Sequence, residues 1–238
     1  MIDALQRLSI DYHFEEEIQE TLSSQHGRIK AYNGRDCNLF DASLRFRLLR
    51  QEGYPVLSDV FNLFTDDEGR FRLHFGKDIR GMMSLYEAAQ FGVQGEEILE
   101  EASAFARAQL CASVAEHGDI QNGLSKMVLD TIEHPYHKTI PRFMTKHNIK
   151  TFYYGSINSG LIEDLAKEDF VIVRSLYRTE ISQISKWWRD LGLSEELKLA
   201  RNQPVKWYMW SVATFADPRH SNQRIELTKA YITHLPDR

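Results

Sequence analysis

Residues 161–191 read LIEDLAKEDFVIVRSLYRTEISQISKWWRDL, which is the clearest indication of fold class in the chain. Apolar side chains recur here at the three- and four-residue spacing of one helix face. Gly192 follows directly, and glycine is the preferred residue just past a helix end. The pattern predicts one long amphipathic helix from about Leu161 to Leu191. The positions expected on its apolar face are Leu165, Val173, Leu176, Ile181, Ile184 and Trp188.

The same periodicity extends over the rest of the chain. Gly and Pro total only 19 of 238 residues, and such a low content of helix breakers favours long helices. We expect helices around Phe14–Leu22, after an N-cap at Asp41, from Glu96 to Leu110, from Leu124 to His134, and a last helix from Pro204.

Residues 71–75 alternate between apolar and polar, but they stand alone after the turn at 66–69, so we interpret them as a loop edge. Without a run of strands, the chain is expected to be all-α, with roughly ten helices. The loop 153–160 is rich in Gly, Ser and Asn and is the predicted domain boundary. The predicted domains are 1–158 and 159–238.

Composition excludes several classes of protein. Lys and Arg total 29 and Asp and Glu total 34, a net charge of −5, whereas nucleic-acid binders usually carry a basic excess. No apolar run approaches the roughly 20 residues that span a bilayer, and Met1–Ala4 begins neither a secretory signal nor a transit peptide. We expect a soluble intracellular protein with no nucleic-acid or membrane partner. The two cysteines, Cys37 and Cys111, cannot form a disulfide framework, and Cys111 is expected to be buried as a small hydrophobe.

Three groups of residues could bind metal, and each has a simpler interpretation. His134 and His137 lie three apart, but a zinc site needs further ligands at suitable spacing. Two glutamate clusters with i, i+1, i+4 spacing could present carboxylates to Mg²⁺, although charge runs are usually solvated helix faces. These clusters are Glu16, Glu17, Glu20 and Glu96, Glu97, Glu100.

Aromatic and basic residues gather near the C-terminus. Trp207 and Trp210 are three apart and so share a helix face, with Met209 beside them and Arg201 and Lys206 just before. Aromatic rings stabilise cations, and Arg can bind phosphate oxygens with two hydrogen bonds. A pocket for a ligand with an apolar tail and an anionic head is one interpretation. Core packing of the tryptophans beside surface cations is the other.

Several segments, in order along the chain, resemble the plant terpene synthase family. They are LSIDYHFEEEI at 8–18, LRFRLLRQEGY at 44–54, DVF at 59–61, SLYEAA at 84–89, GEEIL at 95–99, LAKEDF at 165–170 and ISKWWRDLGL at 184–193. The resemblance runs to about Lys229. It implies a terpene synthase N-terminal α-barrel followed by the first helices of a class I catalytic bundle.

Two further segments resemble the linalool and nerolidol synthases, which make acyclic alcohols. They are EHPYHK at 133–138 and RNQPVKWYMW at 201–210. Most cyclising relatives have Arg-x-Arg where this chain has Arg201-Asn202-Gln203, and Gln at that position is similar to the acyclic branch. The resemblance implies that Mg²⁺ or Mn²⁺ ionises geranyl or farnesyl diphosphate and that water captures the cation. In that scheme Arg201 faces the diphosphate and Trp210 lines the cation pocket.

The chain departs from the family pattern after Glu226–Lys229. The metal-binding Asp-Asp-x-x-Asp expected there is replaced by Ala230–Arg238, and the sequence contains no Asp-x-Asp-Asp. We therefore expect a truncated member with no metal-binding residues, no tight Mg²⁺ binding and no turnover alone. The alternative is a non-catalytic scaffold or dimerisation partner, self-associating through exposed C-terminal helices with Trp187, Trp207 and Trp210 uncovered. Ten- and fifteen-carbon substrates both stay open, as do cytosol and plastid.

Overall fold

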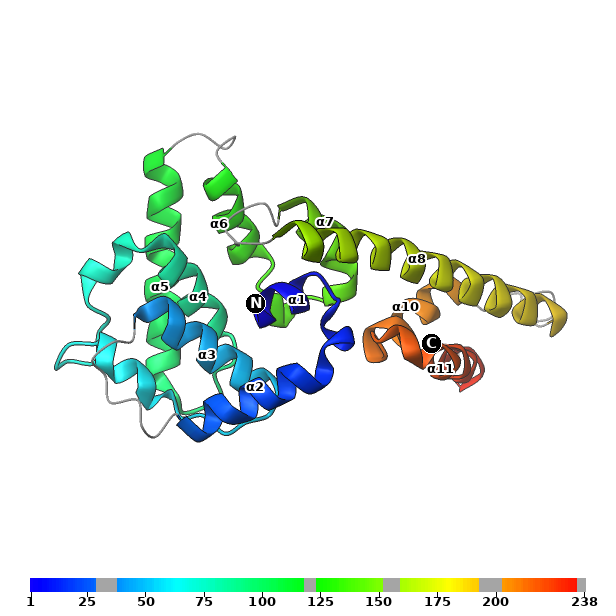
Figure 1. The fold of residues 1–238 in the computed structure, drawn as a ribbon, viewed down its shortest axis with the longest axis horizontal. Coiled ribbons are helices and arrows are strands. Elements are labelled where there is room, and N and C mark those ends of the chain that lie inside the picture. Colours follow the sequence, from blue (N-terminus) through cyan, green and yellow to red (C-terminus); the bar gives the residue numbers. More distant parts are fainter. Residues whose placement is uncertain (29–37, 118–122, 152–158, 193–202, 235–238) are drawn as a thin grey trace. The chain divides into compact units, whose positions relative to one another are not determined.

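The computed structural model describes residues 1–28, 38–117, 123–151, 159–192 and 203–234 (Figure 1). These residues form α-helices joined by short 3₁₀ turns. Their only β-type pairing is an isolated bridge between Thr65 and Phe71, so the all-α prediction is confirmed. Residues 71–75 form no strand, but their interpretation as a loop is wrong in part, because Leu73–Lys77 is a 3₁₀ helix. The α-helices are α1 (Ile2–Arg7), α2 (Glu15–Arg28), α3 (Leu39–Gln51), α4 (Ile79–Ala89), α5 (Glu97–His117), α6 (Gly123–Glu133), α7 (Pro141–Thr151), α8 (Ser159–Asp190), α10 (Pro204–Thr214) and α11 (Ser221–His234).

Contacts between Cα positions divide the chain into two compact units. Unit 1 comprises Met1–Arg7 and His13–Met144, and unit 2 comprises Leu8–Tyr12 and Thr145–Arg238. Unit 2 therefore includes a short segment from near the N-terminus, where Tyr12 Oη donates a hydrogen bond to the carboxylate of Asp169. The expected boundary loop at 152–158 lies outside the described residues, and the boundary near residue 158 stays a prediction.

The core of unit 1 lies where α4 packs against α3 and α5 (Figure 1). On α5 the buried positions follow the predicted helical spacing, and they are Leu99, Ala102, Ala106 and Leu110. Cys111 is exposed, so its predicted burial is wrong. It lies about 100° around the helix from Leu110, which turns its side chain off the buried stripe.

The start of α3 differs from the prediction by one turn. Asn38 is the N-cap, and its side-chain oxygen accepts a hydrogen bond from the Asp41 amide at 2.8 Å. Asp41 lies in the first turn and returns the interaction by accepting from Asn38 Nδ2 at 2.9 Å. Asn and Asp are both favoured as N-caps, so residue type alone did not distinguish Asn38 from Asp41. Gly53 ends the segment as predicted, with a φ of +79° that glycine adopts without strain.

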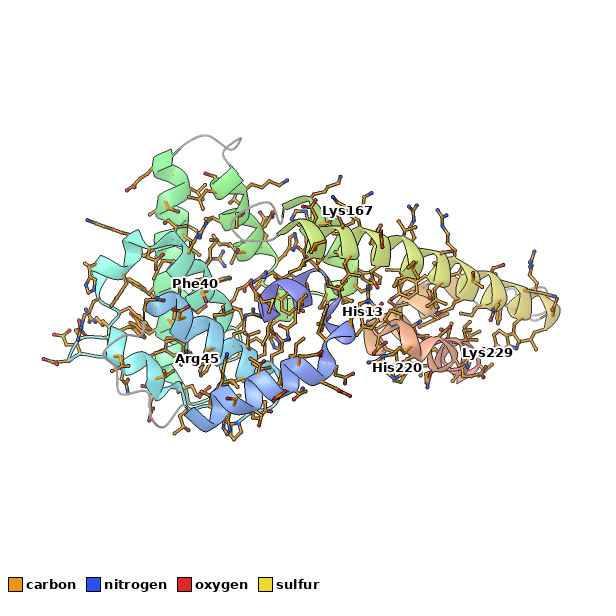
Figure 2. All side chains as sticks on the ribbon, in the orientation of Figure 1. His13, Phe40, Arg45, Lys167, His220 and Lys229 are labelled. Atoms are coloured by element: carbon orange, nitrogen blue, oxygen red, sulfur yellow. The ribbon has the colours of Figure 1, made fainter. Side chains whose placement is uncertain are left out.

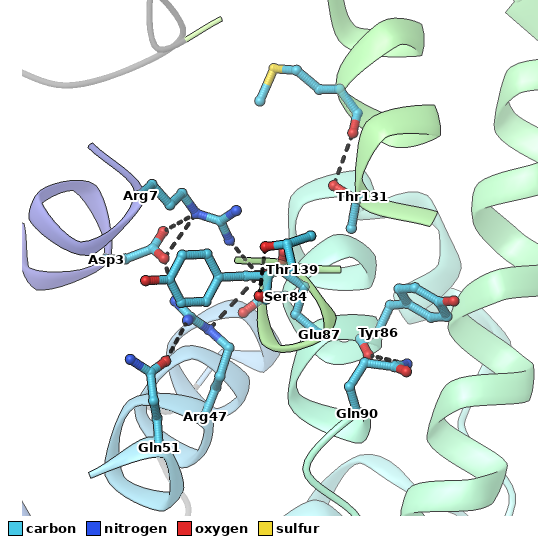
Figure 3. Close-up of polar contacts among 12 residues, drawn as sticks. Asp3, Arg7, Arg47, Gln51, Ser84, Tyr86, Glu87, Gln90, Thr131 and Thr139 are labelled. Atoms are coloured by element: carbon cyan, nitrogen blue, oxygen red, sulfur yellow. Dashed lines mark hydrogen bonds and ion pairs between the residues drawn. The ribbon is translucent and has the colours of Figure 1, made fainter. Parts of the chain in front are cut away.

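A network of four charges ties α1 to α3 and α4 inside unit 1 (Figure 3). Arg7 pairs with both Asp3 and Glu87, and the buried Arg47 also pairs with Asp3 and lies 3.7 Å from Glu87. The two guanidinium groups lie 5.4 and 5.3 Å from the centre of the Tyr136 ring. Burial opposes ionisation of Asp3, but the charges of Arg7 and Arg47 outweigh it and lower the pKa of that carboxyl.

Unit 2 is built on α8, against which α10 and α11 pack. Both bounds of α8 agree closely with the predicted 161–191, and Gly192 follows with a φ of +68°. Its predicted apolar face is confirmed at Val173, Ile184 and Trp188, which are buried. The expectation that the helix from Pro204 is the last one is wrong, because α11 follows it. The buried stripe of α11 contains Arg224 and Thr228, so an apolar pattern does not mark it.

Candidate functional site

Helix α10 has two contrasting faces. Its inner face is formed by Tyr208, Ser211 and Val212, all buried; Tyr208 and Val212 belong to a cluster with Ile184 of α8 and Ile225 of α11. Its outer side is exposed to solvent and carries apolar side chains beside Lys206. Val205 is 49% exposed, Met209 50% and Trp210 58%. A helix that carries apolar side chains on both sides is suited to pack inward and to contact an apolar partner or ligand outward.

The start of α10 agrees with the sequence prediction. Pro204 occupies the first turn, where its missing N–H costs no helical hydrogen bond. The main-chain carbonyl of Gln203 accepts from the Lys206 amide at 3.0 Å, while the exposed Gln203 side chain makes no capping bond. Arg201, the predicted diphosphate contact, lies outside the described residues.

The two tryptophans of α10 differ in environment. Trp207 is half-buried, and the Lys206 ammonium lies 5.7 Å from the centre of its ring. Trp210 is mostly exposed. On α8, Trp187 is half-buried as well, and the ammonium of Lys229 lies 5.8 Å from the centre of its ring. Lys229 is labelled on α11 in Figure 2. Trp210 is therefore the aromatic ring of α10 that is open to a ligand, whereas Trp207 is partly packed.

The inner face of α10 is held by polar side chains that the apolar pattern did not reveal. Tyr208 Oη donates to Glu180 Oε2 at 2.6 Å, and Thr228 Oγ1 donates to Ser211 Oγ at 2.8 Å. Burial and the hydrogen bond to Glu180 raise the pKa of the Tyr208 hydroxyl well above its usual range. The phenol therefore stays protonated and remains the donor to Glu180.

Glu180 is in turn paired with Arg224, and both side chains are essentially inaccessible to water. Arg224 Nη2 lies 2.7 Å from Glu180 Oε1, and Nε lies 3.0 Å from Oε2. The same guanidinium donates to the carbonyls of Phe215, Asp217 and Pro218, which follow the end of α10. Burial disfavours the charge of Arg224, but the hydrogen bonds and charge of Glu180 prevail and raise its pKa.

A signal for this network was present in the sequence. On α8 the buried positions Asp169, Val173, Glu180 and Ile184 are separated by four, seven and four residues, so all four share a face. A carboxylate at a position that the helical periodicity places on the buried face needs a hydrogen-bonding or charged partner there, because an unpaired buried charge is costly. The partner of Glu180 lies 44 residues away, and sequence spacing alone did not identify it.

The metal sites considered in the sequence are not assembled in the structure. Glu16, Glu17 and Glu20 are all exposed, and Glu96 instead forms an ion pair with Arg50. The ring centres of His137 and Phe91 lie 3.9 Å apart. Burial, together with the charge of Lys138, lowers the pKa of His137. Among the described residues, three or more His, Cys, Asp or Glu side chains nowhere gather closely enough to bind a metal ion. These residues do not fit a cluster of divalent cations.

Comparison with known proteins identifies the family. The model described as "Terpene synthase, N-terminal domain" matches residues 1–132, more than half of the chain, and "Terpene synthase family, metal binding domain" matches residues 189–236. The chain belongs to the terpene synthase family. The resemblance found in the sequence is thus confirmed, and the second match shows that the family uses a divalent metal.

Individual terpene synthases match nearly all of the chain. "Probable terpene synthase 13" from Ricinus communis is 45% identical over 96% of this chain and 40% of its own length. An (E)-nerolidol synthase from Cannabis sativa is 42% identical over 97% of this chain and 43% of its own length. The chain thus spans about two fifths of the length of these relatives.

Solved structures support the terpene synthase fold. Isoprene synthase from grey poplar leaves, in complex with three Mg²⁺ ions and dimethylallyl-S-thiolodiphosphate, matches with a TM-score of 0.83 and 30% identity, over 97% of this chain and 44% of its own. That protein therefore binds a prenyl diphosphate analogue together with metal. No helix in the described part of the present chain is long and apolar enough to cross a membrane.

Proposed function

We propose that the chain supplies the N-terminal helical domain and one wall of the substrate pocket of a synthase that makes an acyclic terpene alcohol. The substrate would be geranyl or farnesyl diphosphate and the product linalool or nerolidol. The observation that carries this proposal is the 42% identity to an (E)-nerolidol synthase over 97% of the chain. Gln203, which resembles the acyclic branch rather than the cyclising enzymes, supports it.

The role proposed for Trp210 follows from its position on the outer side of α10. Ionisation would leave an allylic cation beside the released diphosphate in a water-poor pocket, and the negative face of an indole ring stabilises such a positive charge. By the family resemblance, Arg201 would contact the diphosphate. Ionisation by Mg²⁺ is assigned to none of the described residues, because their carboxylates do not gather into a metal site.

We therefore propose that the 238-residue chain by itself does not convert either substrate. The test is incubation with geranyl and farnesyl diphosphate, each with Mg²⁺ and with Mn²⁺, followed by analysis of volatile products. The expected yield equals that of a heat-inactivated control. Linalool or nerolidol clearly above that control would overturn the proposed inactivity.

A chimera tests the synthase assignment directly. In it, the present chain replaces the matching 43% of the Cannabis sativa (E)-nerolidol synthase. We expect an acyclic alcohol as the main product, and we expect Trp210→Ala to lower kcat about tenfold or more, because a desolvated cation–π contact contributes about 2 kcal/mol. Val171→Ala, at an exposed position of α8, is the matched control. A chimera that folds but forms mainly cyclic products would contradict the assignment.

For the isolated chain we propose self-association with a second copy through unit 2. The support is the set of exposed apolar side chains on two of its helices. On α8 Val171 is 65% exposed and Ile172 67%, and on α10 Met209 and Trp210 are at least half exposed. Monomeric proteins rarely leave large contiguous apolar patches in water. Sedimentation velocity over a range of concentrations is the test, and a monomer at every concentration would refute the proposal.

A further inference from the structure

We infer that Glu180, Arg224 and Tyr208 are positioning residues for the reaction: they hold α10 so that the Trp210 ring keeps a defined place in the pocket wall. This inference rests on the proposed function, because it takes Trp210 as the ring that faces the cation. None of the three side chains is available to touch substrate, since Glu180 and Arg224 are fully buried and Tyr208 is 3% exposed. Their effect on the reaction would pass through the helix that carries Trp210.

The hydrogen bonds of Arg224 exclude a direct role in binding diphosphate. A guanidinium has five N–H donors. Here Nε and one Nη2 donor go to Glu180, and the other three go to the carbonyls of Phe215, Asp217 and Pro218. The set of donors is thus completely used within unit 2. Arg224 instead joins α8, the exit of α10 and the start of α11 at one point.

Two anchors on the inner face locate α10 itself. Tyr208 is bonded to Glu180, and Ser211, three residues later, is bonded to Thr228 of α11. Trp210 lies between these anchors in sequence and turns to the outer side. Because hydrogen bonds weaken steeply with distance and angle, the two anchors restrict both the rotation and the sliding of α10. Apolar contacts, such as those of Val212, are non-directional and do not fix the helix in this way.

The energetics of buried ion pairs agree with a positioning role. Desolvation of both charges offsets most of their attraction, so a well-packed apolar replacement often gives equal or greater stability. An apolar core would therefore hold α10 against α8 as tightly. What the Glu180–Arg224 pair adds is a specific arrangement of the elements around it.

The first test uses the 238-residue chain and needs no activity. The chain is labelled with 5-fluorotryptophan, and the ¹⁹F resonance of Trp210 is assigned from Trp210→Phe. We expect Tyr208→Phe and Arg224→Lys to shift or broaden the Trp210 resonance, while the Trp188 resonance of α8 stays in place. Tyr54→Phe removes the same hydroxyl from unit 1 and should change neither. Lower thermal stability with an unmoved Trp210 resonance, or equal movement of all four resonances, would overturn the inference.

The second test uses the chimera with the nerolidol synthase. We expect Tyr208→Phe to lower kcat about three- to tenfold, which corresponds to one net hydrogen bond. KM should change less than about twofold, because the substrate contacts remain. A Tyr208→Phe chimera with a moved Trp210 resonance but unchanged kcat and product ratio would refute the positioning role. An inactive chimera in which the variants still move Trp210 selectively would count against the proposed function, and the structural part of the inference would stand.

Discussion

The two units bury charge in different ways. In unit 1, two arginines share two carboxylates, and Arg7 contacts both Asp3 and Glu87, so each acid has a second cation beside Arg47 (Figure 3). In unit 2, Glu180 has one cation, Arg224, which also satisfies three main-chain carbonyls. The network of unit 1 is therefore redundant, whereas that of unit 2 depends on a single side chain.

This difference corresponds to what each unit carries. The redundant network ties α1 to two helices of the packed core of unit 1. The network of unit 2 lies beneath a helix whose opposite side presents Met209 and Trp210 to solvent. A single connection point makes the outer side of α10 sensitive to changes in the buried face. Breaking each network in turn tests the contrast.

The largest effect is expected for Arg224→Met. It leaves Glu180 charged and buried with only the Tyr208 hydroxyl, a situation that typically costs about 3–5 kcal/mol. Arg47→Met should cost less, about 1–3 kcal/mol, because Arg7 still pairs with both acids of that network. Urea unfolding measures the free energy of unfolding of each variant, and hydrogen exchange shows whether the loss lies in unit 1 or unit 2.

Arg178→Met and Arg80→Met, at exposed positions of unit 2 and unit 1, are the matched controls. Their free energies of unfolding should stay within about 0.5 kcal/mol of the parent chain. Equal losses for Arg224→Met and Arg47→Met would contradict the proposed contrast between a redundant and a single-point network.

Acid should weaken unit 1 through a separate ion pair, between Arg50 and Glu96. The hydrogen bonds from Arg50 lower the pKa of Glu96 to about 2, despite partial burial. In the unfolded chain this carboxyl titrates near its usual value of about 4.3. Its stabilisation is therefore complete above about pH 4.3, declines as the pH falls and is lost at about pH 2. The amount lost should be about 1–3 kcal/mol.

Thermal unfolding of the parent chain and of Glu96→Gln, from pH 6 to pH 2.5, measures this contribution. The variant should be less stable at pH 6, and its difference from the parent should shrink towards the acid end. Glu97→Gln, at the exposed neighbouring position, is the control. A constant difference between Glu96→Gln and the parent over the whole pH range would disprove the assignment.

Local patterns predicted most of the helices, because a helix face is a property of residues three and four apart. Both ends of α8 and the start of α10 at Pro204 could be recognised in this way. The errors arose where a pattern left two choices or gave none. Asn38 and Asp41 both suit an N-cap, and the buried stripe of α11 includes the charged Arg224.

The candidate site was predictable only on its outer side. Trp210 was identified as a potential pocket residue from its neighbours and from the family resemblance. The anchors beneath it were missed, because Glu180, Tyr208 and Arg224 come from three helices separated by up to 44 residues. Pairing across that distance is a property of packing, and periodicity within one helix does not report it.

The smallest effect on stability is expected on the outer side of α10. Met209→Glu places a charge where the side chain is already half exposed, so the free energy of unfolding should change by no more than about 0.5 kcal/mol. Self-association should nevertheless fall clearly in sedimentation velocity, since an acidic side chain must be desolvated in an apolar contact between two copies. Leu73→Glu, at a position of unit 1 that is 77% exposed, is the control for an added charge alone. If Met209→Glu destabilised unit 2 as much as Arg224→Met, the outer side would be part of the core, and the contrast between the two faces of α10 would be wrong.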